Sequence, residues 1–175
     1  MADKVLQVHP SLNIPYEVEA TVVSAGAGNA GDVVGLDATG KIDVSVLPTG
    51  IGADVAIIQA TENLAAGDLV NIYDSSGAKV RKADASASSA AEIAHGFVKN
   101  NVTSGNNATV YFEGSNDQMS ALTPGTTYAL SESTPGGVVA LASATTTAGH
   151  SLQVVGVATA ATVLNVEFAK PIIRS

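Results

Sequence analysis

Short apolar segments separated by polar turns follow one another along most of the chain. The segments are rich in β-branched residues and are bounded by Gly, Asn, Ser or Pro, a pattern typical of antiparallel strands. Residues 85–95, rich in Ala and Ser, indicate a loop or at most one helical turn. The pattern predicts an all-β fold, an antiparallel β-sandwich or small barrel with an extended N-terminal arm. Strands are expected at residues 16–24, 53–60, 68–74, 78–83, 93–99, 108–114, 126–131, 137–142, 152–159 and 162–169.

Tight turns are expected where Gly or Pro interrupts the strand pattern. Residues 72–80 (IYDSSGAKV) predict a β-hairpin, in which Gly77 offers the positive φ that a tight turn requires. Residues 123–127 and 134–137 each place Pro directly before Gly. This favours a turn because Pro fixes its own φ at the position before the Gly. These turns fall between expected strands and agree with the all-β prediction.

The character of the sequence changes near residue 52. Residues 1–52 contain Pro10, Pro15 and Pro48, many Gly, and strands too short to build a core, whereas regular strand spacing begins at about residue 53. We therefore expect an extended arm or small subdomain at 1–52 and a β-domain at 53–175. An arm without a core usually borrows one from a neighbour, which favours an oligomer or a docked partner.

The composition restricts both the core and the surface. Of the 175 residues, 46% are hydrophobic, 4% are aromatic and 14% are charged, and neither Trp nor Cys occurs. The core must be built from Val, Ile, Leu and Ala, and the surface from Ser, Thr, Asn and Gly. Such a surface suits a protein that packs into an assembly or works outside the cell, and the lack of Cys fits synthesis in a reducing cytoplasm as well as many exported bacterial proteins.

The charge argues against nucleic acid or an anionic membrane as a partner. The net charge is −8, and the eight Lys and Arg residues form no block, the nearest group being Lys79, Arg81 and Lys82. Binding to either polyanion needs a basic surface. No apolar stretch approaches the ~20 residues of a membrane span, and no signal peptide is visible at the start of the sequence.

Residues 26–31 (GAGNAG) match the G-x-G-x-x-G pattern of dinucleotide-binding proteins. That site needs a helix directly after the glycines, because the helix N-terminus receives the pyrophosphate. The following residues, DVVGLDATGKIDV, favour strands instead. We therefore expect a hinge in the arm and no bound cofactor.

The histidines and serines do not form a catalytic or metal-binding pattern. His9, His95 and His150 are far apart in the sequence, and none has a second ligand at metal-binding spacing. His95 is expected inside a strand. Ser151 follows His150 directly, and neighbours on a strand point to opposite faces, so they are not expected to act as nucleophile and base. We predict neither a catalytic residue nor a metal site.

Two pairs of carboxylates keep one enzymatic alternative open. Glu17 and Glu19 are expected on one strand face, and Asp37 and Asp43 flank an expected turn, so a small glycoside hydrolase is an alternative. Such enzymes usually present aromatic platforms to the sugar, and Trp is absent. The oxygen-rich residues 74–77 and 115–118 are too sparse for a calcium loop.

Residues 30–48 (AGDVVGLDATGKIDVSVLP) resemble a motif that recurs in the structural proteins of bacteriophages. The downstream sequence resembles phage capsid cement proteins, also called head decoration proteins, and the likeness extends over most of the chain. The segments that carry it are ENLAAGDLVNIY (62–73), GAKVRKADAS (77–86), IAHGFV (93–98), LTPGTTYALSESTPGGVV (122–139) and GHSLQVVGVATAATVLNVEF (149–168).

The resemblance implies a non-enzymatic virion protein. It would be made in the host cytoplasm and would dock on the outer surface of an assembled phage head. There it would bridge subunits of the major capsid protein and stabilise them against the internal pressure of the DNA, often as a homotrimer at three-fold positions. The family has no catalytic residue and no cofactor to transfer to this chain.

The N-terminal arm is the expected contact with the capsid. Its apolar residues Val5, Leu6, Val8, Leu12, Ile14 and Tyr16 are the predicted partner contacts, and Pro10 and Pro15 reduce the entropy lost when the arm becomes ordered. A phage tail-fibre or baseplate component and a bacterial surface adhesion module remain alternatives, and the adhesion module would need an export signal.

Overall fold

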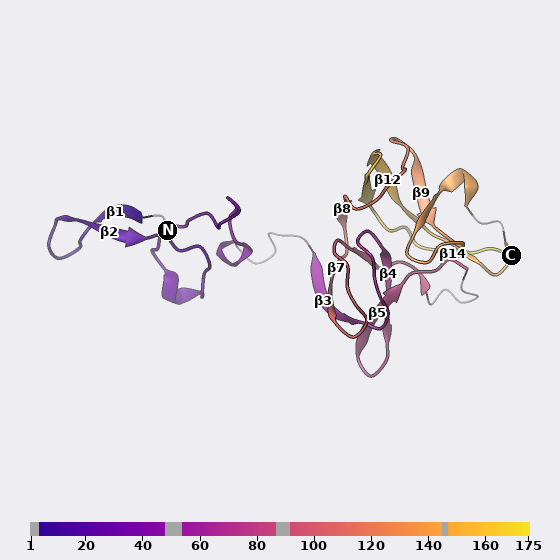
Figure 1. Cartoon of the computed structure of the whole chain (residues 1–175), viewed down its shortest axis with the longest axis horizontal. Coiled ribbons are helices and arrows are strands. Elements are labelled where there is room, and N and C mark those ends of the chain that lie inside the picture. The colour runs from indigo at the N-terminus through magenta and orange to yellow at the C-terminus, as the bar shows by residue number, and fades with distance from the viewer. Residues whose placement is uncertain (1–3, 48–53, 87–91, 145–146) are drawn as a thin grey trace. The chain divides into compact units, whose positions relative to one another are not determined.

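The computed structural model describes residues 4–47, 54–86, 92–144 and 147–175. The chain divides into two compact units, Met1–Gly52 (unit 1) and Ala53–Ser175 (unit 2). Strands make up most of the regular secondary structure of the described residues, and the described helices are single 3-10 turns of three residues, none of which is long enough to span a membrane (Figure 1). The predicted all-β fold class is confirmed.

Unit 1 begins with a β-hairpin followed by irregular turns. Strand β1 (Lys4–Val8) pairs antiparallel with β2 (Pro15–Glu19), so that Lys4 lies opposite Glu19 and Val8 opposite Pro15. The residues after β2 form two 3-10 turns, η1 (Ala27–Asn29) and η2 (Val44–Val46). This part of the chain is therefore folded back on itself and is not one extended segment.

Unit 2 contains a small closed barrel whose strands run in the order β3-β5-β4-β6-β7. Neighbouring strands are antiparallel except β3 and β5, which are parallel. The predicted hairpin is β4–β5, and Gly77 in its turn has φ of 108°. The barrel strands are β3 (Val55–Ala60), β4 (Leu69–Asp74), β5 (Ala78–Lys82), β6 (Gly96–Val98) and β7 (Asn107–Tyr111).

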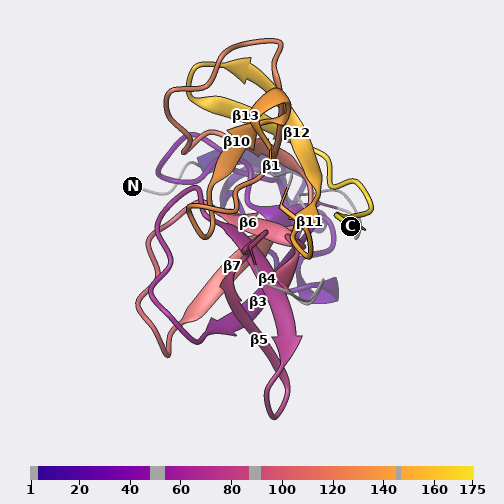
Figure 2. The ribbon, with the colours of Figure 1, turned by 90° about the vertical axis from the view of Figure 1, so that its right-hand side faces the viewer.

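A second sheet of five strands, all antiparallel and in the order β10-β9-β12-β13-β8, completes unit 2 (Figure 2). Its strands are β8 (Gly114–Asn116), β9 (Thr127–Leu130), β10 (Val138–Ala140), β12 (Val154–Ala160) and β13 (Val163–Val166). A further pair joins β11 (Ser151–Leu152) to β14 (Ile172–Ile173), and the 3-10 turn η4 (Leu141–Ser143) follows β10.

Unit 2 has two hydrophobic cores that share the wall formed by β4 and β6. Because successive residues of a strand point to opposite faces, Leu69 and Phe97 join one core while Val70 and Val98 join the other. The first core lies against the second sheet and includes Leu130. The second core belongs to the barrel and includes Ile58, Leu64, Val80, Ala108 and Val110.

Several predicted strands end earlier than the sequence suggested. Strand β2 ends at Glu19, because Thr21 pairs instead with Val34 in an isolated parallel bridge. The segment expected at 108–114 divides into β7 and β8. The segment expected at 152–159 is interrupted at Gln153, because the chain passes there from β11, which pairs with β14, to β12, which pairs with β9. The segments expected at 137–142 and 162–169 are shortened to β10 and β13.

His95 lies directly before β6, and not inside a strand as predicted. Its backbone N–H donates to the carbonyl oxygen of Val70 at 2.8 Å, and its Nδ1 atom accepts the backbone N–H of Ile72 at 3.0 Å. The imidazole ring of His95 therefore accepts the N–H of Ile72. A backbone carbonyl would accept this N–H if β6 extended further toward the N-terminus. The expected loop at 85–95 lies partly outside the described residues.

Candidate functional site

The six predicted partner contacts all lie on the β1–β2 hairpin of unit 1. Val5, Leu6 and Val8 lie on β1, Leu12 and Ile14 in the connecting loop, and Tyr16 on β2. Five of the six are exposed, and Val5 is partly buried. The exposed fractions are 73% for Leu6, 64% for Val8, 63% for Leu12, 54% for Ile14 and 37% for Tyr16.

The strand register divides these side chains between the two faces of the hairpin. Leu6 lies opposite Glu17, and Val8 shares its face two residues along, whereas Val5 lies opposite Val18 on the other face. Glu17 forms an ion pair with Lys4 at 2.8 Å, which borders Leu6 with charged groups. The hairpin therefore brings the candidates together in one element but presents apolar groups on both faces.

The hairpin loop is held by His9. Its Nδ1 atom accepts the backbone N–H groups of Ser11 and Leu12, each at 3.2 Å, and its ring meets that of Tyr16 edge to face, with centroids 5.2 Å apart. These contacts fix the base of the loop that carries Leu12 and Ile14. The sequence pattern gave no indication of this role.

Sequence reasoning missed a second group of exposed apolar residues in unit 1. Val33, Val34, Leu36 and Ile42 are 37%, 50%, 53% and 52% exposed. They lie within the motif of residues 30–48 that carried the resemblance to phage structural proteins. Their run of aliphatic residues was visible, but short Gly-bounded segments are equally typical of strands that cover a core.

Among residues 4–43 and 45–47, for which the structure gives burial, no large apolar side chain is buried. Gly35 is the one buried residue in these two ranges. Ten large apolar side chains are exposed here, although an isolated two-stranded hairpin is only marginally stable in water. They are Leu6, Val8, Leu12, Ile14, Tyr16, Val23, Val33, Val34, Leu36 and Ile42.

Polar hydrogen bonds, in place of a core, hold unit 1 in shape. Asp32 accepts the hydroxyl of Thr21 at 2.6 Å and the side-chain amide of Asn29 at 2.9 Å, and these bonds lower the pKa of its carboxyl. The backbone N–H of Ser24 donates to the hydroxyl of Ser45 at 2.8 Å. Unit 1 is thus folded, yet its apolar groups remain available for contact.

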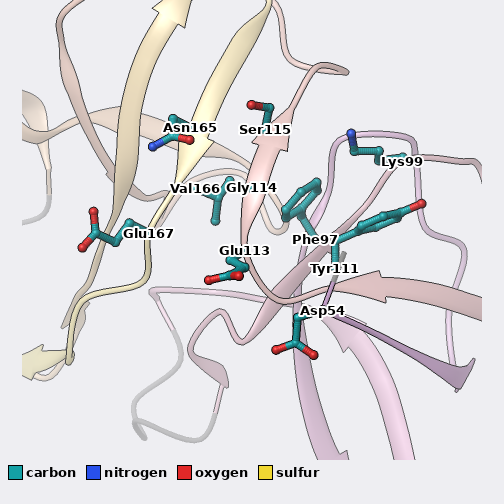
Figure 3. A pocket seen from close by; sticks show the side chains of 10 residues that line it. All are labelled: Asp54, Phe97, Lys99, Tyr111, Glu113, Gly114, Ser115, Asn165, Val166 and Glu167. Carbon is teal, nitrogen blue, oxygen red and sulfur yellow. The ribbon is translucent and has the colours of Figure 1, made fainter. Parts of the chain in front are cut away.

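Unit 2 contains an open cleft of about 520 Å³ where the barrel meets the second sheet (Figure 3). Asp54, Glu113 and Glu167 place carboxylates around it. The ring of Tyr111 is stacked on Phe97, and Lys99 lies over it with Nζ 5.4 Å from the ring centroid. Gly114, Ser115, Asn165 and Val166 complete the lining.

The cleft offers hydrogen-bond acceptors but little surface for stacking a ligand. The contacts with Phe97 and Lys99 occupy the ring of Tyr111, and Lys99 also approaches Asp117 at 3.5 Å. None of the three histidines lines the cleft. Within the described ranges, no group of three or more His, Asp or Glu side chains is placed to hold a metal ion.

The other chemical candidates serve local structure. Residues 26–31 contain the 3-10 turn η1, and residues 32–36 continue without a helix. Glu17 and Glu19 both lie on β2, and Asp74 accepts the N–H of Gly77 in the β4–β5 turn. Asn116 is buried, with its side-chain amide bonded to the carbonyl oxygen of Gly67 at 2.9 Å.

His150 and Ser151 have different surroundings. Nδ1 of His150 lies 2.7 Å from a carboxylate oxygen of Glu132. The hydroxyl of Ser151 is buried and has no hydrogen-bond partner among the described residues. The structure therefore does not join them as a base and its nucleophile.

Comparison with protein-family models, with curated proteins and with solved structures finds no match for this chain.

Proposed function

We propose that this chain is a bacteriophage structural protein that docks on the outside of an assembled head and stabilises it by bridging capsid subunits. The observation that carries this proposal is the exposure of ten large apolar side chains in unit 1, where residues 4–43 and 45–47 bury none. A segment with that composition is stabilised when it lies against another protein.

The two units suit two different tasks. Unit 2 has its own cores and supplies a body that is stable without a partner. Unit 1 supplies apolar contacts on a scaffold held by polar bonds. In the proposed homotrimer, contacts made by three tethered copies act at a high effective concentration, so that modest individual contacts add up to firm attachment.

The resemblance to head decoration proteins indicates which protein the partner would be. The major capsid protein would receive unit 1, and two further copies of this chain would complete a homotrimer on the head surface. Of the segments that carry the resemblance, residues 62–73 and 77–86 include β4 and β5, and residues 149–168 include β12 and β13. These strands belong to the barrel and to the second sheet of unit 2. A structural role in an assembly would depend on such strands.

Electron microscopy of the phage particles tests this proposal. Gold-labelled antibody against unit 2 should mark the head surface at regular positions. Label confined to the tail or baseplate would favour the alternative of a tail-fibre component. Label on the surface of uninfected bacteria would favour an adhesion module, and either result would overturn the proposed function.

A further inference from the structure

Residues 32–43 of unit 1 carry a second group of exposed apolar side chains, outside the β1–β2 hairpin. Three apolar side chains, Val34, Leu36 and Ile42, are each about half exposed, at 50%, 53% and 52%. We call these three residues the apolar strip. The backbone that carries them is fixed by hydrogen bonds, so the strip has a defined shape before any partner binds.

The first part of this backbone is anchored to Thr21. The N–H of Thr21 donates to the carbonyl oxygen of Val33 at 2.8 Å, and the N–H of Gly35 donates to that of Thr21 at 3.0 Å. Gly35 is buried against Ala20, where an added Cβ would lie 2.9 Å from the Cβ of Ala20. Since side chains alternate along an extended segment, Val34 and Leu36 point away from Ala20.

The second part is a turn built on Asp37. Its backbone N–H donates to the carbonyl oxygen of Lys41 at 2.7 Å, and its side chain accepts the backbone N–H groups of Thr39 at 2.8 Å and Lys41 at 2.9 Å. Leu36 and Ile42 therefore flank the two ends of one closed turn.

Carboxylates border the strip. Asp32, Asp37 and Asp43 lie before, within and after it, and residues 20–47 contain a single basic residue, Lys41. Hydrogen bonds lower the pKa of each of these carboxyls. The main donor is the hydroxyl of Thr21 for Asp32, the backbone N–H of Lys41 for Asp37, and Ser45 for Asp43. The border is therefore negatively charged at neutral pH.

We propose that the apolar strip docks into an apolar groove of a partner protein that is rimmed by Lys or Arg side chains. Charge complementarity selects this occupant. A second copy of the chain would bring the same acidic border against the first, and like charges placed together across an interface are strongly unfavourable. The inference rests on the proposed function in one respect, because it places the groove on the outer surface of the phage head.

The test uses variants of the full chain and heads purified without it. Leu36→Ser and Ile42→Ser should each weaken binding about tenfold, because burial of each side chain is lost. Lys41→Glu should speed association at low salt several-fold, and Lys41→Gln should have a smaller effect in the same direction. Lys41 is exposed and bonds the turn through its backbone, so both variants keep the turn. Amide NMR signals of Thr39 and Lys41 check this.

Each outcome decides the inference. If the wild-type chain binds heads and Leu36→Ser and Ile42→Ser bind equally well, the strip is not a docking surface, although the proposed function stands. If Lys41→Glu slows association, the partner's rim is not basic. If sedimentation shows that the free chain self-associates and that Ile42→Ser abolishes this, the occupant is a second copy. If the wild-type chain does not bind heads, both the inference and the proposed function are wrong.

Discussion

At the scale of single residues, Gly156 is the glycine of unit 2 where an added Cβ would meet a neighbouring strand most closely. This residue of β12 lies opposite Val166 of β13, and a Cβ added to it would collide with the carbonyl oxygen of Asn165. That oxygen belongs to the backbone of a central sheet strand and cannot move without disturbing the sheet.

Gly156→Ala is therefore expected to destabilise unit 2 by about 1–3 kcal/mol, the usual cost of overpacking a core. Urea unfolding followed by circular dichroism measures this. Val157→Thr, at the neighbouring position that is 40% exposed, is the matched control and should leave the midpoint nearly unchanged. Equal midpoints for Gly156→Ala and wild type would contradict the close approach.

His95 should make the stability of unit 2 sensitive to mild acid. Burial lowers the pKa of its imidazole below the ordinary value of 6.5, and a protonated Nδ1 atom cannot accept the N–H of Ile72. The neutral form is favoured in the folded state, so its contribution to stability is complete above that ordinary pKa. It is lost as the pH falls from there toward the lower pKa of the folded state.

The prediction is tested by comparing urea midpoints at about pH 7.5 and about pH 5.5. His95→Asn keeps a side-chain acceptor but does not titrate, so its midpoint should fall less with acid than that of the wild type. His9→Asn, in unit 1, should keep the wild-type dependence. Identical slopes for wild type and His95→Asn would show that another group is responsible.

At the scale of elements, apolar alternation and Gly turns predicted most of the strands and the β4–β5 hairpin. Strand ends were predicted less well. At His95 a side chain accepts a backbone N–H, and at Gln153 the chain passes from one strand pair to another, and neither event is visible in the apolar pattern. The parallel pairing of β3 with β5 joins strands that are not consecutive, and local pattern carries no information about such a contact.

The local sequence pattern was also insufficient to predict how the candidate contact residues are arranged. The sequence named Leu6 and Ile14 as candidate contacts of the N-terminal arm, but it did not predict the hairpin that separates the apolar groups onto two faces. The apolar strip was missed because aliphatic residues between glycines have the same pattern whether they are buried or exposed. Only burial, a property of the folded chain, distinguishes the two cases.

The hairpin gives a prediction at this scale, with a closely matched control. Leu6 on β1 is 73% exposed and Ile57 on β3 is 72% exposed, so neither substitution by Ser removes core packing. Leu6→Ser should weaken binding to heads about tenfold, because one apolar contact is lost, whereas Ile57→Ser in the barrel should bind like the wild type. Surface plasmon resonance on immobilised heads measures both. Equal losses would show that the hairpin has no special part in docking.

At the scale of the whole molecule, the chain combines a unit rich in buried apolar side chains with a unit that exposes them. The division explains how a protein with few charges remains foldable by itself and still has surfaces suited to assembly. The large core side chains, such as Phe97, Leu130 and Leu164, lie in unit 2, so docking of unit 1 need not disturb the body of the protein.

The most direct test of this account is the disruption temperature of purified heads that lack the chain, measured by light scattering with and without added protein. A protein that binds the assembled head and not its separated subunits raises the apparent stability of the head, and the gain grows with the logarithm of the free protein concentration above Kd. We expect the full chain to bind and to raise the disruption temperature as its concentration increases, and expect the Leu6→Ser, Leu36→Ser double variant to raise it less at equal concentration. A disruption temperature that stays unchanged at saturating protein would contradict the central claim.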